Sequence, residues 1–332
     1  MHGYLTPQKV GEDKAARKRR WALLSSKAIP EKSEVYNTPT PNNLKRELPE
    51  IQYDDFKNSS YGVYRWLKQV NESGICLMTG VPAEDDMVHK VAEHIGPISS
   101  TIYGKTFDVV STPKPINVAY SSVALDFHMD LIYYESPPGI QFLHCLRFDD
   151  CVAGGESRFQ DLFHTAERFR RNSSKHFEIL TRIPATFQKI HYSRYHLAFV
   201  LFNLVFQKTS VILYLFLNLF QIVGVNWSPS FEGPLATEEE NVEPFYAAYE
   251  AFAKAIKNST NILEYRLQPG DLISFNNRRI LHARNGFELN GGMRHLKGCY
   301  VNIDHFKSQV QVFSRLSGDG QPPKRVGNQD WF

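Results

Sequence analysis

Strand-like segments of this chain fall into two groups that lie far apart in the sequence, and this separation limits the folds that the chain can adopt. The first group lies within residues 115–160. The second comprises residues 264–277, 278–287 and 293–304, which contain a Pro-Gly-Asp turn and alternating patterns. Because strands need partners, the late group must close against the early one. The pattern predicts an α+β fold in which a β-sandwich or barrel carries additional helices.

Helices are expected on four amphipathic segments. Apolar residues recur with helical period in residues 61–74, 84–97, 163–172 and 243–258. Gly74 ends the first segment, and Gly96 with Pro97 ends the second, since glycine and proline commonly terminate helices. Residues 74–80, which follow the first helix, are expected to form a short buried strand.

Composition and charge indicate a globular protein with a small-molecule partner. The 332 residues are 42% hydrophobic, enough for one large domain, which we place at residues 51–332 after a loosely structured arm at residues 1–50. The formal net charge is only +3, and outside residues 14–20 basic and acidic residues are mixed, which argues against nucleic-acid binding. The four cysteines form no CxxC pair, as expected of a reducing compartment without structural zinc.

The N-terminal residues predict a cytoplasmic protein. They have no apolar core of the kind found in secretory signals. Glu12 and Asp13 disfavour a mitochondrial transit peptide, so a mitochondrial location is the alternative rather than the first expectation.

One long apolar segment does not match this picture. Residues 197–225 are almost continuously hydrophobic, interrupted by Gln207 and Lys208, and their length could span a bilayer. A transmembrane helix here would carry the middle of a closing β-barrel into lipid and leave strands with unpaired backbone groups. We therefore expect no membrane span. The segment is interpreted as an anomalous insertion, with translated intron sequence favoured over a genuine insertion.

A histidine and an aspartate stand two positions apart in the apolar and aromatic segment ALDFHMDLIYY, residues 124–134. In an extended segment side chains alternate between faces, so His128 and Asp130 would point to the same side. An imidazole and a carboxylate at this spacing, together with one distant histidine, form the facial triad of non-haem iron(II) oxygenases. Such a pair is more often only hydrogen-bonded, so the metal hypothesis depends on its partners.

The third ligand is expected from a late strand. His282, which follows the hairpin-like QPGDLISF segment, is the best candidate. The competitors are His144, His295 and His305. These three are better explained as ordinary core or surface histidines.

An anionic co-substrate bound opposite these ligands would need a fixed cation. Arg294 suits this role because a guanidinium binds carboxylate bidentately and stays charged when buried. Arg294 and Tyr300 share one face of the strand-like MRHLKGCY segment, with Gly298 leaving room between them. His295 and Lys297 lie on the opposite face.

These motifs resemble those of the γ-butyrobetaine and trimethyllysine hydroxylases, which are Fe(II)- and 2-oxoglutarate-dependent dioxygenases of carnitine biosynthesis. The resemblance covers residues 51–312 apart from the apolar segment, through YGKTFDV, NVAYSSVALDFHMD, PPGIQFLHCL, GGES, QPGDLISFNNRRILHAR and RHLKGCY. It implies a double-stranded β-helix (jelly-roll) core like that of taurine dioxygenase, with flanking helices.

The resemblance also implies a set of ligands. Iron would be bound by His128, Asp130 and His282. The co-substrates would be 2-oxoglutarate and O2, with ascorbate as reductant. Arg294 would hold 2-oxoglutarate, with help from the hydroxyl of Ser157 in GGES.

In the butyrobetaine enzymes an aromatic cage holds the trimethylammonium group of the substrate. The matching positions here are Tyr103, Phe107, Tyr120 and Tyr300. Asn117 matches an asparagine near the substrate carboxylate. Aromatic faces are natural partners of a group that cannot donate a hydrogen bond, and each is worth ~0.5 to 2 kcal/mol. Phe107 stands where the mammalian enzyme has tryptophan, which implies a weaker or differently shaped cage.

The activity implied is hydroxylation of γ-butyrobetaine to L-carnitine, with two alternatives. Trimethyllysine hydroxylation is the first, because Leu131 replaces a tyrosine of the butyrobetaine enzymes and ALD before His128 resembles the trimethyllysine enzymes. A non-catalytic quaternary-ammonium-binding member, with its core disrupted by residues 197–225, is the second. The resemblance further implies a homodimer. It also implies that the arm is the remnant of a missing zinc-binding N-terminal module.

Overall fold

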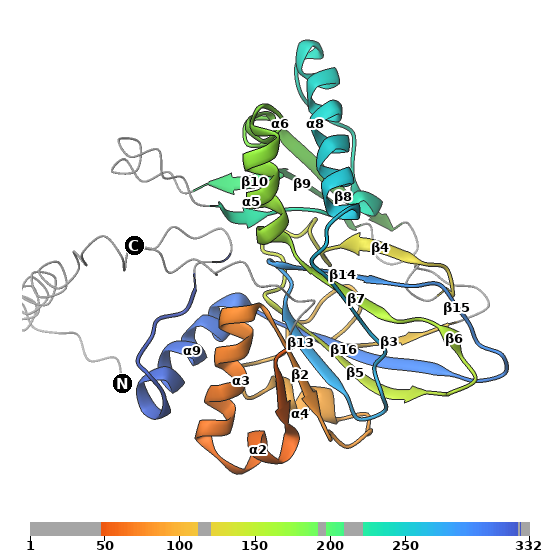
Figure 1. Cartoon of the computed structure of the whole chain (residues 1–332), viewed down its shortest axis with the longest axis vertical. Helices are drawn as coiled ribbons and strands as arrows, with labels where there is room; N and C mark the ends of the chain where they lie inside the picture. The colour runs from red at the N-terminus through yellow and green to blue at the C-terminus, as the bar shows by residue number, and fades with distance from the viewer. Residues whose placement is uncertain (1–47, 112–120, 192–196, 209–221, 325, 327–332) are drawn as a thin grey trace, which may run out of the picture. The chain divides into compact units, whose positions relative to one another are not determined.

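Two β-sheets form the core of the computed structural model, which describes residues 48–111, 121–191, 197–208, 222–324 and 326 (Figure 1). The six-stranded sheet contains, in spatial order, β1 (Glu50–Gln52), β2 (Ile75–Thr79), β13 (Leu272–Asn276), β5 (Ile140–Phe148), β16 (Arg294–Val301) and β3 (Thr106–Val110). The four-stranded sheet contains β12 (Ile262–Tyr265), β7 (Ser157–Asp161), β14 (Ile280–Arg284) and β4 (Leu125–His128). A short pair joins β15 (Phe287–Glu288) to β6 (Ala153–Gly154). The predicted arm, residues 1–50, lies almost entirely outside the described residues.

Late strands lie between early strands in both sheets. β16 pairs with β5 on one side and β3 on the other, and β14 pairs with β4 and β7, all antiparallel. The prediction that the late strands close against the early ones is therefore confirmed. This interleaving brings segments more than a hundred residues apart to one site.

The six-stranded sheet is covered on both faces, as β13 shows. All five of its residues are buried. Leu272 packs with the helices that follow β1 and β16, whereas Ile273 and Phe275 pack toward the four-stranded sheet. Both faces of this strand therefore have covering partners, and its buried Ser274 hydroxyl accepts a hydrogen bond of 2.9 Å from the indole N–H of Trp66.

The helices that cover the outer face of the six-stranded sheet are α2 (Tyr53–Asn58), α3 (Ser60–Ser73), α4 (Met87–Ala92) and α9 (Ile303–Ser317) (Figure 1). The side chain of Ser59 caps α3 by accepting a hydrogen bond from the backbone N–H of Gly62. Gly74 ends α3 with a φ of +79°, as the sequence predicts. α4 is shorter than predicted, because residues 85–86 form a turn before it and residues 93–95 form another after it.

A second group of helices packs with the chain around the apolar segment. It consists of α5 (Leu162–Asn172), α6 (Ser174–Leu180), α8 (Glu239–Lys257) and the short 3-10 helix η2 (Pro229–Phe231). The predictions for residues 163–172 and 243–258 are confirmed. α8 buries the apolar stripe identified in the sequence, which is Phe245, Ala248, Tyr249, Phe252 and Ile256.

A buried ion pair joins the four-stranded sheet to α3. The guanidinium of Arg279 lies 2.7 Å from the carboxylate of Asp161, and both side chains are fully buried. Arg279 also donates to the backbone carbonyl of Glu72 at 2.7 Å. Asp161 accepts a further hydrogen bond from the backbone N–H of Phe163, which caps α5.

Where the apolar segment is described, it forms strands. β8 (Pro184–His191) pairs with β9 (Leu197–Leu204), and β10 (Phe206–Lys208) pairs with β11 (Ile222–Val225), both antiparallel. Residues 209–221 lie outside the described part of the chain. No helix among the described residues is both long and apolar enough to cross a membrane. The interpretation of the segment as an insertion stays a prediction.

Candidate metal centre

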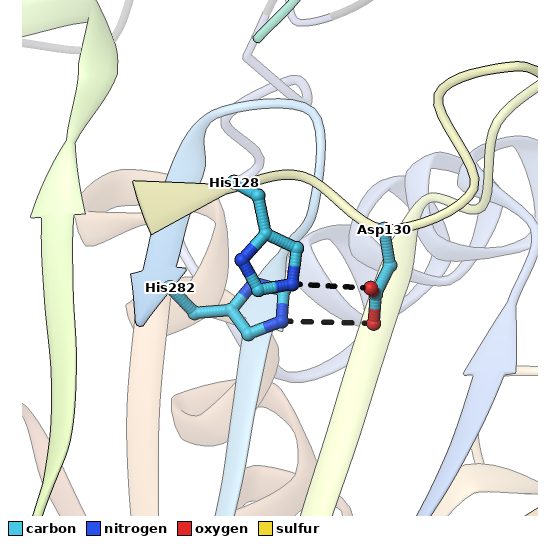
Figure 2. A group of neighbouring side chains, drawn as sticks. All are labelled: His128, Asp130 and His282. Carbon is cyan, nitrogen blue, oxygen red and sulfur yellow. Dashed lines mark ion pairs between the residues drawn. The ribbon is translucent and has the colours of Figure 1, made fainter. Parts of the chain in front are cut away.

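Two histidines and one aspartate meet where β4 and β14 pair (Figure 2). His128 ends β4 and lies directly opposite His282 of β14, with ring centroids 4.1 Å apart. Asp130 points at both rings: its Oδ1 is 3.4 Å from Nε2 of His128, and its Oδ2 is 3.6 Å from Nε2 of His282. One ligand atom from each residue lies within 4.8 Å of the other two. This is a spacing at which one ion can contact all three.

The strand ends sooner than the sequence suggests. β4 stops at His128, so Asp130 lies in the turn that follows, and Leu131 has a φ of +55°. Asn277 holds this turn through two hydrogen bonds of 2.9 Å, accepting from the backbone N–H of Asp130 and donating to its carbonyl. The two side chains still converge. Their convergence depends on this turn and not on the strand alternation that the sequence predicts.

The donor atoms suit a divalent transition metal. Nδ1 of His128 lies 2.8 Å from the backbone carbonyl of Asp126, so the imidazole donates there, and in the neutral form of the ring the Nε2 lone pair faces Asp130. Nδ1 of His282 is buried without a hydrogen-bond partner in the described structure, while its Nε2 faces the same point. Two imidazoles and one carboxylate on one side of a pocket match the ligand set of non-haem iron(II) oxygenases.

The ionisation of Asp130 and His282 matches metal binding. Burial alone would raise the pKa of Asp130, but attraction to His282 and hydrogen bonds from both imidazoles outweigh it and hold that pKa well below its usual value. Burial, reinforced by the nearby His128, lowers the pKa of His282. Asp130 is therefore an anion at neutral pH, and the lowered pKa of His282 favours its neutral imidazole, which are the ligand forms of both groups. Burial lowers the pKa of His128, but hydrogen bonding and attraction to Asp130 outweigh burial and raise it, so a metal would displace the proton of that ring.

Two further side chains fix the Asp130 carboxylate. Gln141 of β5 donates to Oδ2 at 2.7 Å, and the Tyr300 hydroxyl donates to the same oxygen at 2.8 Å. Burial, strengthened by the charge of Asp130, raises the pKa of Tyr300, so its hydroxyl keeps the proton that it donates. Gln141 was not identified from the sequence, because nothing in its local pattern marks it as a partner of Asp130.

A pocket of about 650 Å³, including space open to solvent, lies over the trio. Side chains of both sheets line it: Tyr103, Phe107, Val109, Leu125, His128, Asp130, Gln141, Leu143, Ser157, His282, Ala283, Arg284, Arg294, Leu296 and Tyr300. On β16, Arg294, Leu296 and Tyr300 share the pocket face, while Lys297 reaches Asp85 on the outside. The alternation predicted for this strand is confirmed.

Arg294 is a buried cation of the pocket. Its side chain is 3% exposed, and its Nε donates to the backbone carbonyl of Gly155 at 3.2 Å. Burial, together with the positive charge of Arg284, lowers its pKa to about 9, so it remains protonated at neutral pH. Ser157 is also buried and lines the same pocket.

Arg284 is a second buried arginine of the same pocket that the sequence reasoning missed. It donates to the backbone carbonyls of Ser121 and Val123, and burial lowers its pKa to about 10. The sequence could have identified Arg284, because it follows His282 by two positions on one strand and therefore lies on the same face of that strand. Two guanidinium groups in one pocket indicate a site for an anion.

The aromatic residues assigned to a cage are only partly brought together. Phe107 and Tyr300 stack with centroids 5.0 Å apart, and Tyr103 lies 6.3 Å from Phe107. The room predicted at Gly298 is filled by the Phe107 ring, which any side chain there would strike. Asn117 and Tyr120 lie outside the described residues.

The competing histidines lie elsewhere. His144 is fully buried in the core, where desolvation lowers its pKa to about 4. His295 pairs with Asp108 at 2.7 Å on the outer face of the sheet, and His305 is exposed on α9. His282 is the histidine that meets His128 and Asp130.

Two sheets closed around two histidines, one carboxylate and a buried arginine define the class of iron(II)- and 2-oxoglutarate-dependent oxygenases. Solved structures share the fold. AAD-2 in complex with Mn(II) and N-oxalylglycine has a TM-score of 0.58 at 12% identity, covering 80% of this chain and 97% of that one. An asparagine oxygenase in complex with Fe(II), 2S,3S-3-hydroxyasparagine and succinate has a TM-score of 0.54 at 16% identity, covering 73% and 79%.

The chain belongs to the Taurine catabolism dioxygenase TauD, TfdA family, whose model matches residues 37–300. The dioxygenase str8 of Strobilurus tenacellus is 30% identical over 267 residues, covering 76% of this chain and 60% of that protein. The gamma-butyrobetaine dioxygenase of Pseudomonas sp. (strain AK-1) is 31% identical over 269 residues, covering 81% and 67%. The mitochondrial trimethyllysine dioxygenase of Mus musculus is 28% identical over 262 residues, covering 78% and 59%.

These comparisons confirm the resemblance, the jelly-roll α+β fold class and the enzyme class predicted from the motifs. The chain covers between 59% and 67% of the length of these three relatives. Their names include two different substrates, so they do not choose between γ-butyrobetaine and trimethyllysine.

Proposed function

We propose that this protein hydroxylates γ-butyrobetaine to L-carnitine with Fe(II), 2-oxoglutarate and O2. The observation that carries the proposal is a single pocket in which three metal-binding groups, a buried arginine and two stacked aromatic rings face one another. The name of the Pseudomonas relative supports the choice of substrate.

His128, Asp130 and His282 would hold the iron. Bound there with 2-oxoglutarate, iron(II) supplies the oxidation of a substrate C–H bond by O2, coupled to decarboxylation of the keto acid to succinate and carbon dioxide. The chain would orient the ligand atoms around the metal. Gln141 and Tyr300 hold one oxygen of the Asp130 carboxylate, which keeps the other directed at the metal position.

Arg294 would bind the carboxylate of 2-oxoglutarate that lies away from the metal. Its Nε is engaged by Gly155, and no other donor of this guanidinium is hydrogen-bonded within the described structure. Both terminal nitrogens therefore remain for a carboxylate, in the bidentate geometry that arginine favours. The hydroxyl of Ser157, on the same wall, would add one hydrogen bond.

Phe107 and Tyr300 would hold the quaternary ammonium group of the substrate. Both rings line the pocket, and the hydroxyl of Tyr300 donates a hydrogen bond to Asp130. A cation held against these two rings would therefore lie close to the metal position. Each ring contributes ~0.5 to 2 kcal/mol to such binding. Holding the cation here fixes which substrate carbon faces the oxidising centre, and this placement determines where hydroxylation occurs. Asn117 and Tyr120 remain predicted contacts.

An assay of both substrates tests the proposal. The full chain is incubated with Fe(II), 2-oxoglutarate, ascorbate and O2, and succinate and hydroxylated product are measured for γ-butyrobetaine and for trimethyllysine. We expect product from γ-butyrobetaine, and we expect none from His128→Ala at an unchanged melting temperature. Product from trimethyllysine alone would show that the protein is a trimethyllysine hydroxylase, which is the second candidate function. That candidate is favoured by the mouse relative and by Leu131 after the metal motif.

The non-catalytic alternative predicts a protein without bound iron or succinate formation. The structure favours catalysis, because the trio and Arg294 are complete and face one pocket. Two compartments remain as candidates for the protein. The cytoplasm is our expectation, and the mitochondrion is the alternative that the name of the mouse relative suggests. A homodimer stays a prediction.

A further inference from the structure

Arg266, which lies between β12 and β13, holds one loop of the backbone at three points. Its Nη1 donates to the carbonyl of Gly154 at 3.0 Å, and its Nη2 donates to the carbonyls of Asp149 at 3.2 Å and Val152 at 3.0 Å. These three carbonyls belong to residues 149–154, which lie between β5 and β7 and are called the clamped loop below. A planar guanidinium with several donors can hold such a set of acceptors in one geometry.

The clamped loop leads directly into Gly155, whose carbonyl accepts the hydrogen bond from Nε of Arg294 at 3.2 Å. Gly155 has a φ of +80°, and a Cβ at this position would lie 3.2 Å from both Cδ and Nε of Arg294. The backbone N–H of Gly155 donates to the carbonyl of Gly286 at 3.1 Å. Gly155 is thus held by the clamped loop on one side and by Gly286 on the other, and its position fixes one edge of the Arg294 guanidinium.

A buried aromatic ring provides a second connection between the two arginines. Cζ of Arg266 lies 3.8 Å from the ring centroid of Phe148, and Cζ of Arg294 lies 5.2 Å from the same centroid. The register of β16 and β5 places Phe148 opposite Arg294. Guanidinium groups pack favourably against aromatic rings, so Arg266 and Arg294 are each held against this one side chain.

Arg266 acts on Arg294 from outside the pocket. Arg294 is among the described residues that line the pocket, and Arg266 is not. Burial is the main cause that lowers the pKa of Arg294, Arg284 is the next, and the positive charge of Arg266 adds to them. The two guanidinium groups therefore repel each other, so the hydrogen bonds and the shared ring, rather than charge attraction, hold them in place.

We propose that Arg266 is a positioning residue for the keto acid: it fixes the clamped loop and the ring of Phe148, and through them it directs the guanidinium of Arg294 at the far carboxylate of 2-oxoglutarate. The inference rests on the role proposed above for Arg294. It makes Arg266 a determinant of specificity, because only a keto acid with a second carboxylate uses the orientation of Arg294.

Two keto acids of the same chain length test this inference. 2-Oxoglutarate carries the far carboxylate, and 2-oxovalerate has a methyl group in its place. Binding is measured by anaerobic calorimetry on the full chain loaded with Mn(II). We expect Arg266→Met to raise the Kd for 2-oxoglutarate about tenfold and to leave the Kd for 2-oxovalerate within about threefold of the wild-type value. Equal weakening of both ligands would indicate a merely structural role and overturn the inference, as would unchanged binding of 2-oxoglutarate.

The coupling between the two arginines gives a second readout. If Arg266 acts through Arg294, adding Arg266→Met to a protein that already carries Arg294→Met should change the Kd for 2-oxoglutarate by less than about threefold. Losses that multiply in the double variant would show that Arg266 acts independently of Arg294, and they would overturn the inference.

Arg147→Met is the matched control. Arg147 is exposed and pairs with Asp149 of the clamped loop at 2.7 Å, so this variant removes the same charge beside the same loop. It should bind 2-oxoglutarate like the wild-type protein, because an exposed ion pair contributes little. A loss as large as that in Arg266→Met would assign the effect to charge and overturn the inference.

Arg266→Lys separates position from charge in a milder variant, which also decides the question if Arg266→Met does not fold. Lysine keeps the positive charge but lacks the planar group that contacts three carbonyls and the ring of Phe148. We expect this variant to bind 2-oxoglutarate at least about threefold more weakly than the wild-type protein, with 2-oxovalerate unaffected. Wild-type affinity for 2-oxoglutarate would mean that charge alone matters, and it would overturn the inference.

The two proposals fail separately. If the wild-type protein hydroxylates neither γ-butyrobetaine nor trimethyllysine, but Arg266→Met selectively loses affinity for 2-oxoglutarate, the proposed function is wrong and the positioning role stands. If Arg294→Met binds 2-oxoglutarate more weakly and Arg266→Met binds it normally, the positioning role is wrong and the role proposed for Arg294 stands.

Discussion

The hydroxyl of Tyr300 lies 2.8 Å from Oδ2 of Asp130, so a single side chain joins the substrate pocket to a metal ligand. Its ring stacks on Phe107 at the place proposed for the quaternary ammonium. Any ligand that moves this ring also moves a hydrogen bond to the carboxylate proposed to bind iron. The pocket and the metal centre are therefore coupled through Tyr300.

The first prediction concerns this hydrogen bond. Tyr300→Phe keeps the stacked ring but removes the donor to Asp130, and partners of this kind typically affect metal affinity by about 10-fold to 100-fold. We expect the affinity for Mn(II), measured by anaerobic titration, to fall by that order. Tyr61→Phe, at an exposed tyrosine far from the site, should bind Mn(II) normally. An unchanged affinity in Tyr300→Phe would mean that the contact has no role in holding the ligand.

Arg294 should control the affinity for 2-oxoglutarate. Hydrogen bonds to charged groups contribute about 1.5–3 kcal/mol, so Arg294→Met should raise the Kd for 2-oxoglutarate by one to two orders of magnitude. Calorimetry of the metal-loaded protein measures this directly. Arg294→Lys should recover only part of the affinity, because lysine cannot form the bidentate pair. Normal binding by both variants would assign the keto acid to Arg284 instead.

The buried ion pair between Asp161 and Arg279 should be a large contributor to stability. Asp161→Asn leaves a buried guanidinium without its counter-charge and weakens the cap of α5, and breaking such a pair costs about 3–5 kcal/mol. Urea unfolding followed by circular dichroism should show the loss. Glu250→Gln, which breaks an exposed pair on α8, should leave the midpoint unchanged.

His144 should make the stability depend on pH. Its pKa in the folded protein is about 4, against 6.5 as the ordinary value, because burial disfavours its charged form. The unfolded chain therefore binds a proton first as pH falls. The stability is fully present above about pH 6.5, and roughly 3 kcal/mol of it is lost as pH falls toward 4.

Urea unfolding at a series of pH values from 7 to 5 measures this loss, with His144→Phe as the comparison. The free energy of unfolding of His144→Phe should depend less on pH than that of the wild-type protein. His305→Gln, at an exposed histidine, should retain the wild-type slope. Identical slopes for the wild-type protein and His144→Phe would contradict the assignment of this pH dependence to His144.

Local sequence patterns correctly predicted which side chains share one face of a strand or a helix. The alternation along β16 placed Arg294 and Tyr300 on one face, and the helical period of α8 identified its buried stripe. The closing of late strands on early ones also followed from the sequence, because unpaired strands need partners. The shared strand face and the helical stripe follow from the periodicity of the backbone, which can be recognised within a single segment.

The features that were missed depend on contacts between distant residues. Asp130 lies in a turn held by Asn277, which is 147 positions away, and no local pattern announces that contact. The same holds for Lys189, which donates a hydrogen bond to the Tyr103 hydroxyl across 86 positions. The sequence gives the residue types, but which side chains contact one another depends on the fold.

The most direct test of the account is the stoichiometry of iron binding under anaerobic conditions. Equilibrium dialysis of the full chain against Fe(II) should give one iron per chain for the wild-type protein. The single variants His128→Ala, Asp130→Ala and His282→Ala should each lose that iron while melting as folded proteins. A wild-type protein that binds no iron, or a His282→Ala protein that still binds one iron as tightly, would contradict the metal centre proposed here.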